Sequence, residues 1–236
     1  MRQGFEFLAS AKESGLLLSL ALALNCFSTI LAWRGEGSEA LEHADALVGL
    51  AAERGFSNWH SFGRLVRGLA LGILQRAGEA VAEITEALES LEATGAAIPG
   101  WAYANLASSY LVATQPQEGL KTTAKALEIA AHTGDAEAKA ELHRLHGELL
   151  LMSDPTESAE AEFSFRSAVE VARKQSAKLA ELRATTSLAR LLRGSNRHDE
   201  ARPMLGNIYN WFTEGFDTAD LKDAKALLDE LSNSPS

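Results

Sequence analysis

The residues best suited to chemistry in this sequence are the arginines and lysines of segment 173–202. Eight basic residues fall in this segment against three acidic ones, although the chain as a whole carries a formal net charge of -10. At helical spacing, Arg183, Arg190 and Arg193 point from one helix toward the inner surface of a helical array. A guanidinium group holds a carboxylate through two hydrogen bonds, so these arginines suit an acidic peptide or an acidic loop of a partner.

Two histidines form the second constellation with chemical potential. His143 and His146 stand three residues apart, with Glu141 and Glu148 nearby, so imidazole and carboxylate groups share one helical region. Holding a metal ion would require further ligands from adjacent helices, and we regard this as the weaker reading. No nucleophile, base and orienting group can be placed together elsewhere, so we expect no catalytic, cofactor or metal site and no enzyme activity.

Composition favours helices and excludes some partners. Five prolines and three tyrosines in 236 residues leave little room for a strand-rich fold. A pI near 5.1 opposes binding to a phosphate backbone, so nucleic acid is not an expected partner. Cys26 is the one cysteine, which excludes a disulfide framework and fits a reducing cytoplasm.

Segment Gly15–Trp33 is long and uncharged enough to be weighed as a membrane span. Polar residues dilute it, its flanks show no positive bias, and no aromatic belt brackets it. We therefore favour a buried helix of a helical array, and no membrane association is expected.

Small residues recur at a fixed interval and indicate tandem helical hairpins. Intervals of 40, 39, 42 and 40 residues separate Ala40, Ala80, Gly119, Ala161 and Ala201. A second small residue lies twelve or fourteen positions upstream of each, at Ser28, Gly68, Ala107, Gly147 and Ala189. Two antiparallel helices approach closely where both side chains are small, so this spacing predicts contact within each pair.

Residues that end helices give an independent register. A glycine just beyond a helix adopts the left-handed conformation at little cost. On this basis second helices are expected to end at Gly55, Gly95, Gly134 and Gly215, with Ser176 in the equivalent place of the fourth hairpin.

Together these registers predict an all-α fold, a right-handed α-α superhelix of the tetratricopeptide (TPR)-like solenoid type. It has about five hairpins of about 40 residues over 15–215. Segment 1–14 is expected to be the tail of a preceding repeat helix, which suggests a fragment of a longer protein. Segment 216–236 is expected to form a C-terminal capping helix with a charged outer face and a short disordered tail.

The second half of the chain also resembles a known family. The matching runs are Glu141–Leu145 with Gly147–Leu150, Ala177–Lys178 with Glu181–Ala184, Ser187–Leu191, and most strongly Tyr209–Thr218 followed by Asp220–Lys222. They are similar to the C-terminal TPR region of bacterial signalling proteins in which a class III adenylate or guanylate cyclase domain and an ATPase module come first. The resemblance implies a packing or hydrogen-bonding role for His143.

The resemblance extends to the repeats only. The sequence contains no P-loop pattern and none of the paired aspartates of a cyclase. Any nucleotide chemistry is therefore expected to lie outside this chain.

The inner surface of the array is the expected partner-binding face. The register assigns to it Asn25, Thr29, Trp101, Asn105, Ser108, Arg144, Glu148, Arg183, Arg190 and Arg193. For the arginines we favour pairing with Glu141, Glu148 and other acids of the fourth hairpin over partner binding. The aromatic residues Trp33, Phe62 and Trp101 suit capture of a peptide, but packing between hairpins is the favoured alternative.

The final aromatic residues have the same two interpretations. Trp211, Phe212 and Phe216 are expected to seat the capping helix, and docking onto an ATPase or cyclase portion is the alternative. The leading hypothesis for the whole chain is a regulatory scaffold that binds a protein or peptide, or the upstream domains of the same longer protein. A sensor of a small anionic molecule, held by the arginines in the same groove, is the alternative.

Overall fold

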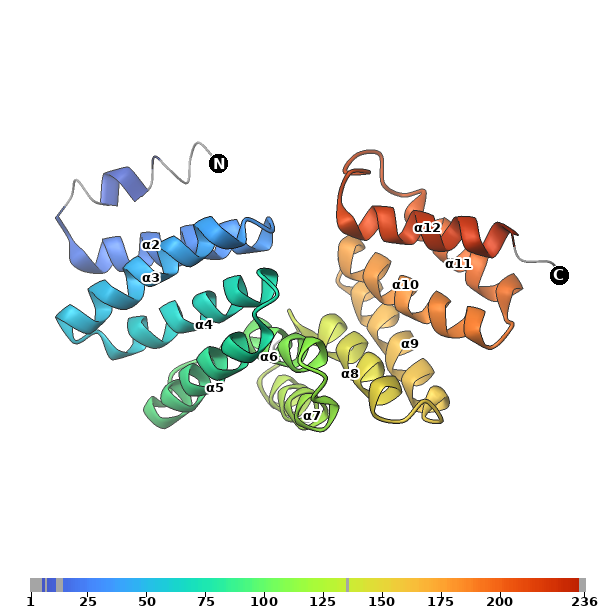
Figure 1. Cartoon of the computed structure of the whole chain (residues 1–236), viewed down its shortest axis with the longest axis horizontal. Helices are drawn as coiled ribbons and strands as arrows, with labels where there is room; N and C mark the ends of the chain where they lie inside the picture. Colours follow the sequence, from blue (N-terminus) through green and yellow to red (C-terminus); the bar gives the residue numbers. More distant parts are fainter. Residues whose placement is uncertain (1–5, 7, 12–14, 135, 234–236) are drawn as a thin grey trace. The chain divides into compact units, whose positions relative to one another are not determined.

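The structure is a computed structural model that describes residues 6, 8–11, 15–134 and 136–233 (Figure 1). All regular structure within these ranges is helical, and no strand occurs in them. The chain forms two compact units, Met1–Ala113 and Thr114–Ser236. The predicted all-α fold class is confirmed.

In each unit, helices that follow one another along the chain pack together. The first unit contains α2 (Leu17–Trp33), α3 (Gly37–Arg54), α4 (Ser57–Ile73), α5 (Ala77–Thr94) and α6 (Gly100–Val112). The second contains α7 (Pro116–Thr133), α8 (Lys139–Ser153), α9 (Ser158–Lys174), α10 (Lys178–Gly194), α11 (His198–Tyr209) and α12 (Ala219–Asn233). The even-numbered helices also form rows: α4 contacts α2 and α6, and α10 contacts α8 and α12.

Left-handed residues end the odd-numbered helices, largely as predicted. Gly55, Gly95 and Gly134 follow α3, α5 and α7 with φ of 69°, 66° and 75°. Ser176, just beyond α9, has φ of 56° although it carries a side chain. The register of helix-ending residues is therefore confirmed at four of its five positions.

The prediction for Gly215 is wrong. Its φ is 78°, but α11 has already ended at Tyr209, and a loop of residues 210–218 follows. The ring of Phe216 in this loop lies 5.8 Å from the ring of Tyr209, the last residue of α11. A continuous helix would separate these two residues by about 10 Å along its axis, so the ring contact requires the chain to leave the helix.

The turns that follow four even-numbered helices contain a second set of left-handed residues, which the sequence did not lead us to expect. Gly35, Gln75, Thr114 and Asn196 follow α2, α4, α6 and α10 with φ of 82°, 61°, 55° and 57°. Only one of them is glycine. Thr114 is the most unusual, because a β-branched residue is strained in this conformation.

Close approach at the small residues is visible in α4 and α5. A Cβ added to Gly68 would lie 3.3 Å from the carbonyl oxygen of Ala80 and only 2.4 Å from Cγ1 of Ile84. In the second unit, a Cβ on Gly147 of α8 would lie 2.6 Å from Cε1 of Phe165 in α9. Gly68 and Gly147 therefore have no room for a side chain, as the predicted helix contacts require.

Segment 1–14 is only partly described. Residues 8–11 are helical, and Leu8 and Ala11 are buried in the same apolar cluster as Phe27 and Leu31 of α2. The rest of the expected preceding repeat helix, apart from Glu6, lies outside the described residues, as does the tail at 234–236. Among the helices that the structure describes, none is long and apolar enough to cross a membrane.

Candidate functional site

The first candidate site is a groove between α4 and α6 in the first unit. It has a volume of about 200 Å³ and includes two of the predicted residues, Asn105 and Ser108. We call it the α4–α6 groove. Its lining consists of Leu69, Gly72, Ile73, Gln75, Ala77, Asn105, Ser108, Ser109 and Val112. None of these side chains is ionisable.

Asn105 is one of the polar residues that line the α4–α6 groove. Its Nδ2 is buried and has no hydrogen-bond partner among the described residues. The hydroxyl of Ser109 does not satisfy it, because that group donates to the main-chain carbonyl of Asn105 at 2.9 Å. A buried donor without an acceptor costs free energy, so Asn105 has an unmet demand for a hydrogen-bond acceptor beside the groove that it lines.

The other predicted residues of the first unit do not join this groove. Oδ1 of Asn25 on α2 is also buried without a partner, and the Thr29 hydroxyl donates to the carbonyl of Asn25 at 2.7 Å. Both α2 and α6 pack on α4, which separates Asn25 from Asn105. Trp101 is half-buried and does not line the groove. Trp33 is 60% exposed, so the expectation that it packs between hairpins is wrong.

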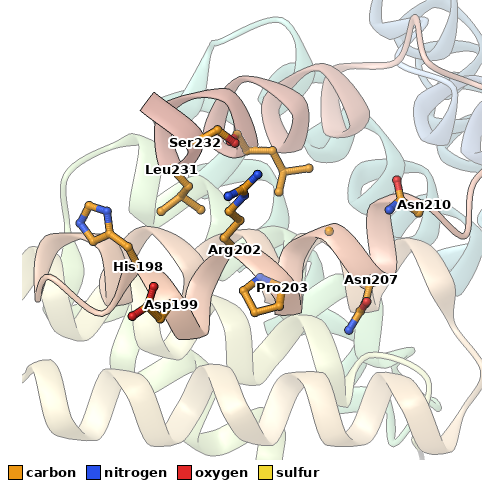
Figure 2. Close-up of a pocket in the computed structure, with 10 residues that line it drawn as sticks. His198, Asp199, Arg202, Pro203, Asn207, Asn210, Leu231 and Ser232 are labelled. Carbon is orange, nitrogen blue, oxygen red and sulfur yellow. The ribbon is translucent and has the colours of Figure 1, made fainter. Parts of the chain in front are cut away.

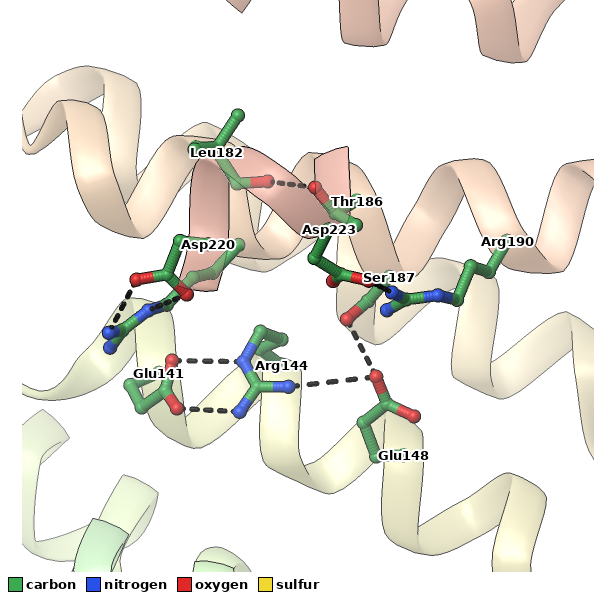
Figure 3. A network of polar contacts seen from close by, with 10 residues as sticks. Glu141, Arg144, Glu148, Leu182, Thr186, Ser187, Arg190, Asp220 and Asp223 are labelled. Carbon is green, nitrogen blue, oxygen red and sulfur yellow. Dashed lines mark hydrogen bonds and ion pairs between the residues drawn. The ribbon is translucent and has the colours of Figure 1, made fainter. Parts of the chain in front are cut away.

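In the second unit, the predicted residues Arg144, Glu148 and Arg190 lie in a network of charged groups (Figure 3). Nε and Nη2 of Arg144 donate to the two carboxylate oxygens of Glu141 at 2.9 and 2.6 Å. Arg144 also faces Glu148 at 3.6 Å, and the Ser187 hydroxyl donates to that carboxylate at 2.6 Å. These contacts join α8 to α10.

The arginines of α10 are paired, but with different partners from those expected. Arg183 donates to both oxygens of Asp220, each at 2.9 Å. Arg190 pairs with Asp223, and Arg193 pairs with Glu230. We expected acids of the fourth hairpin, and that expectation is wrong because α12 packs beside α10 and brings its own acids nearer.

The same contacts correct the expected role of α12. On its apolar side, Leu221, Leu227 and Leu231 are buried in the core of the second unit. Its acidic side was expected to face solvent. Instead, three of its carboxylates reach the arginines of α10 and form what we call the α10–α12 ladder: Arg183–Asp220, Arg190–Asp223 and Arg193–Glu230.

A cavity of about 280 Å³ opens over this network between α8, α10 and α12. The hydrogen bonds that Arg183 donates to Asp220 raise the pKa of its guanidinium despite its partial burial. Burial opposes charge on Glu141, but the neighbouring Arg144 outweighs it and lowers the pKa of that carboxyl. The ionisable residues of the lining are three arginines and three carboxylates: Arg144, Arg183, Arg190, Glu141, Asp220 and Asp223. An anion that enters must displace a carboxylate already in place.

A larger pocket of about 670 Å³ lies between α11 and α12 (Figure 2). Arg202 extends from α11 toward Leu231 and Ser232 of α12, and it makes no ion pair among the described residues. His198 and Asp199 line the same pocket from the first turn of α11. The sequence does not indicate this pocket, because the pocket depends on how α12 packs against α11.

The aromatic residues of the 210–218 loop are only partly buried. Phe212 packs against the core of the second unit, as expected of a residue that seats α12, and Tyr209 at the end of α11 packs there too. Trp211 and Phe216 are 58% and 47% exposed, so for them this expectation is wrong. Trp211 contacts Lys178, whose Nζ lies 5.8 Å from the ring centroid.

His146 of α8 contacts a residue of α7. Nδ1 of His146 lies 2.8 Å from Oγ1 of Thr123, and this hydroxyl also donates to the carbonyl of Leu120 at 3.0 Å. Which of the two groups donates in this contact depends on the tautomer of the His146 ring. In the described part of the chain, no three histidine, cysteine or acidic side chains come together as a possible metal site.

Comparison with solved structures identifies the fold. No family model matches the chain, and no curated protein matches it in sequence. The nearly identical TPR-like repeats assigned to a kinesin light chain of Podospora anserina match 90% of this chain and 96% of their own length, at 16% identity. Two structures of those repeats give TM-scores of 0.59 and 0.57. The fold is the TPR-like repeat fold.

A second TPR-like structure agrees with this result. YrrB, described as a TPR protein with an unusual peptide-binding site, matches 93% of this chain and 97% of its own length. The identity is 16% and the TM-score is 0.51. At this identity, the similarity is one of fold.

Proposed function

We propose that this TPR-like chain is a non-catalytic scaffold that binds an extended peptide segment of a protein partner in the α4–α6 groove. The observation that carries the proposal is the buried Nδ2 of Asn105, which lacks an acceptor. Peptide main chains present a carbonyl at every residue, and an extended segment leaves these carbonyls unpaired. The apolar residues Leu69, Ile73 and Val112 beside Asn105 suit the side chains of such a segment.

The fold supports this proposal. Repeat proteins of this kind use extended surfaces to hold partners. The description of YrrB as a protein with a peptide-binding site adds support at the level of the fold. The uncharged lining of the groove favours a neutral stretch of peptide over an acidic one.

We further propose that the chain works within a larger signalling protein of the cytoplasm that carries a nucleotide cyclase or an ATPase module. The resemblance of Tyr209–Thr218 to the C-terminal repeats of such proteins supports this context. The bound peptide then belongs to a separate partner or to the upstream domains themselves. The reading frame upstream of this chain tests the context: a frame without an ATPase or cyclase domain would contradict it.

Selection from a library of random linear peptides tests the binding function. We expect the chain to enrich peptides that bind with micromolar affinity, and Asn105→Ala to weaken them about 10-fold by removing a hydrogen bond in a buried site. Asn58→Ala is the matched control, because Asn58 is exposed in the first turn of α4. No enrichment over an unrelated helical protein, or equal affinity in both variants, would refute the proposal.

A further inference from the structure

Gly72 is the unusual residue of the α4–α6 groove. It lies one position before the end of α4, where glycine destabilises a helix relative to alanine. The turn that follows does not require it. The same position holds Ala32 in α2 and Leu111 in α6, and each of these helices is also followed by a left-handed residue.

Packing does not require Gly72 either. A Cβ at Gly63 or Gly68 of the same helix would lie 3.0 or 2.4 Å from a neighbouring side chain. A Cβ at Gly72 would meet only Oγ of Ser109, at an ordinary contact distance of 3.7 Å. Gly72 is therefore a position where a side chain fits but none is present.

Because Gly72 has no side chain, space is left in the α4–α6 groove. The volume of about 200 Å³ is below the range of about 300–1,000 Å³ that is common for pockets that hold whole small molecules. It is somewhat larger than an apolar cavity of about 150 Å³ that accepts one benzene molecule. The groove therefore has room for one side chain, and Leu69, Ile73 and Val112 make its walls apolar.

We propose that the space above Gly72 is a specificity pocket for one aliphatic side chain, such as leucine, isoleucine or methionine, of the bound peptide. The inference rests on the proposed peptide-binding function and names the residue that the peptide must carry. Asn105 holds the main chain, and the walls of the pocket select the side chain. A charged side chain is rejected because no lining group can pair with it.

The test places a side chain in the pocket and compares these variants with the same substitutions at an exposed glycine. Gly72→Ala and Gly72→Leu place a methyl or an isobutyl group in the space, and Gly49→Ala and Gly49→Leu are the controls. Gly49 lies in the interior of α3, is exposed, and has no atom near its Cβ position. The alanine variants at both positions should raise thermal stability, because both replace a helical glycine without a clash.

Peptide affinity should distinguish the Gly72 variants from the Gly49 variants. The library should enrich an aliphatic residue at one fixed place, and the affinity of the selected peptides should fall a few-fold for Gly72→Ala. It should fall about 10- to 100-fold for Gly72→Leu, the loss expected when a buried aliphatic side chain is excluded. The Gly49 variants should bind as the unmodified chain does.

Two results would disprove the specificity pocket but leave the proposed peptide-binding function standing. The first is a set of peptides that depend on Asn105 but show no aliphatic preference. The second is unchanged affinity in a folded Gly72→Ala variant, which remains informative even where Gly72→Leu fails to fold. If no peptide is enriched at all, the proposed function fails together with the pocket.

Discussion

Arg183 binds Asp220 through two parallel hydrogen bonds, each 2.9 Å long, and so joins α10 to α12. Both side chains are partly exposed, so the pair is worth about 0.5–1 kcal/mol at most. We expect Asp220→Asn to lower the unfolding free energy of the chain by about this amount in urea titrations. Replacing all three acids of the α10–α12 ladder should also speed hydrogen exchange in α12.

Lys222→Ala provides the control for this prediction. Lys222 is exposed on α12 and makes no ion pair among the described residues, so its loss should leave exchange in α12 unchanged. Added salt should shrink the difference between the Asp220→Asn variant and the unmodified chain, since salt screens exposed pairs. A difference that stays constant in high salt would show that the ladder does not act through charge.

Glu181 makes the stability of the chain depend on pH. Its side chain is only 6% exposed, and it accepts hydrogen bonds from Arg173 at 2.7 Å and Lys178 at 2.8 Å. Burial alone would raise the pKa of this carboxyl, but the two cations outweigh burial and lower the pKa below 4.5. A lowered carboxyl pKa means that the unfolded chain takes up the proton first, so stability is lost as the pH falls below about 4.5.

Urea titrations across a pH series should show this loss directly. Glu181→Gln should lower the unfolding free energy by about 1–3 kcal/mol at neutral pH, because a buried charged hydrogen bond is lost. It should also flatten the decline in acid. Glu214→Gln, a change in the exposed 210–218 loop, should leave the acid slope as it is. Equal slopes in both variants would exclude Glu181 as a source of the pH dependence.

Gly68 should be intolerant of even the smallest side chain. An added Cβ would lie 2.4 Å from Cγ1 of Ile84, a separation that forces α4 and α5 to move. We expect Gly68→Ala to lower the unfolding free energy by about 1–3 kcal/mol, measured by thermal or urea denaturation. Gly78→Ala, which meets open space in the first turn of α5, should be neutral or stabilising. Equal stability of the two variants would contradict the close approach at Gly68.

The parts of the fold that sequence predicts are those with a local physical cause. Gly55, Gly95 and Gly134 end helices because glycine adopts positive φ without strain, and this preference is readable at a single position. Gly68 and Gly147 signal close packing through their size and spacing. Gln75 and Thr114 give no such signal, because their own preferences oppose the conformation that the turn imposes on them.

The candidate sites depend on contacts between distant segments and were harder to predict. The acids of α12 recur at helical spacing, as do the arginines of α10, and this match was the available signal for the ladder. The sequence alone does not predict the ladder, because acids along one side of a terminal helix are also typical of a solvent-facing surface. The pocket at Gly72 had a weaker signal, a glycine outside the small-residue register, which becomes meaningful only once its surroundings are known.

The absence of net charge at the α4–α6 groove and at the cavity over Arg144 also affects how fast a partner binds. The α4–α6 groove has no ionisable lining, and the cavity over Arg144 contains matched charges. Neither surface presents a local field of one sign, so a neutral peptide, as proposed for the groove, gains no electrostatic steering even though the chain carries a net charge of -10. Association is then expected at an ordinary rate of about 10⁵–10⁶ M⁻¹s⁻¹, and a partner with micromolar affinity remains bound for roughly seconds. How long a complex lasts, more than how often it forms, will set the occupancy of this scaffold.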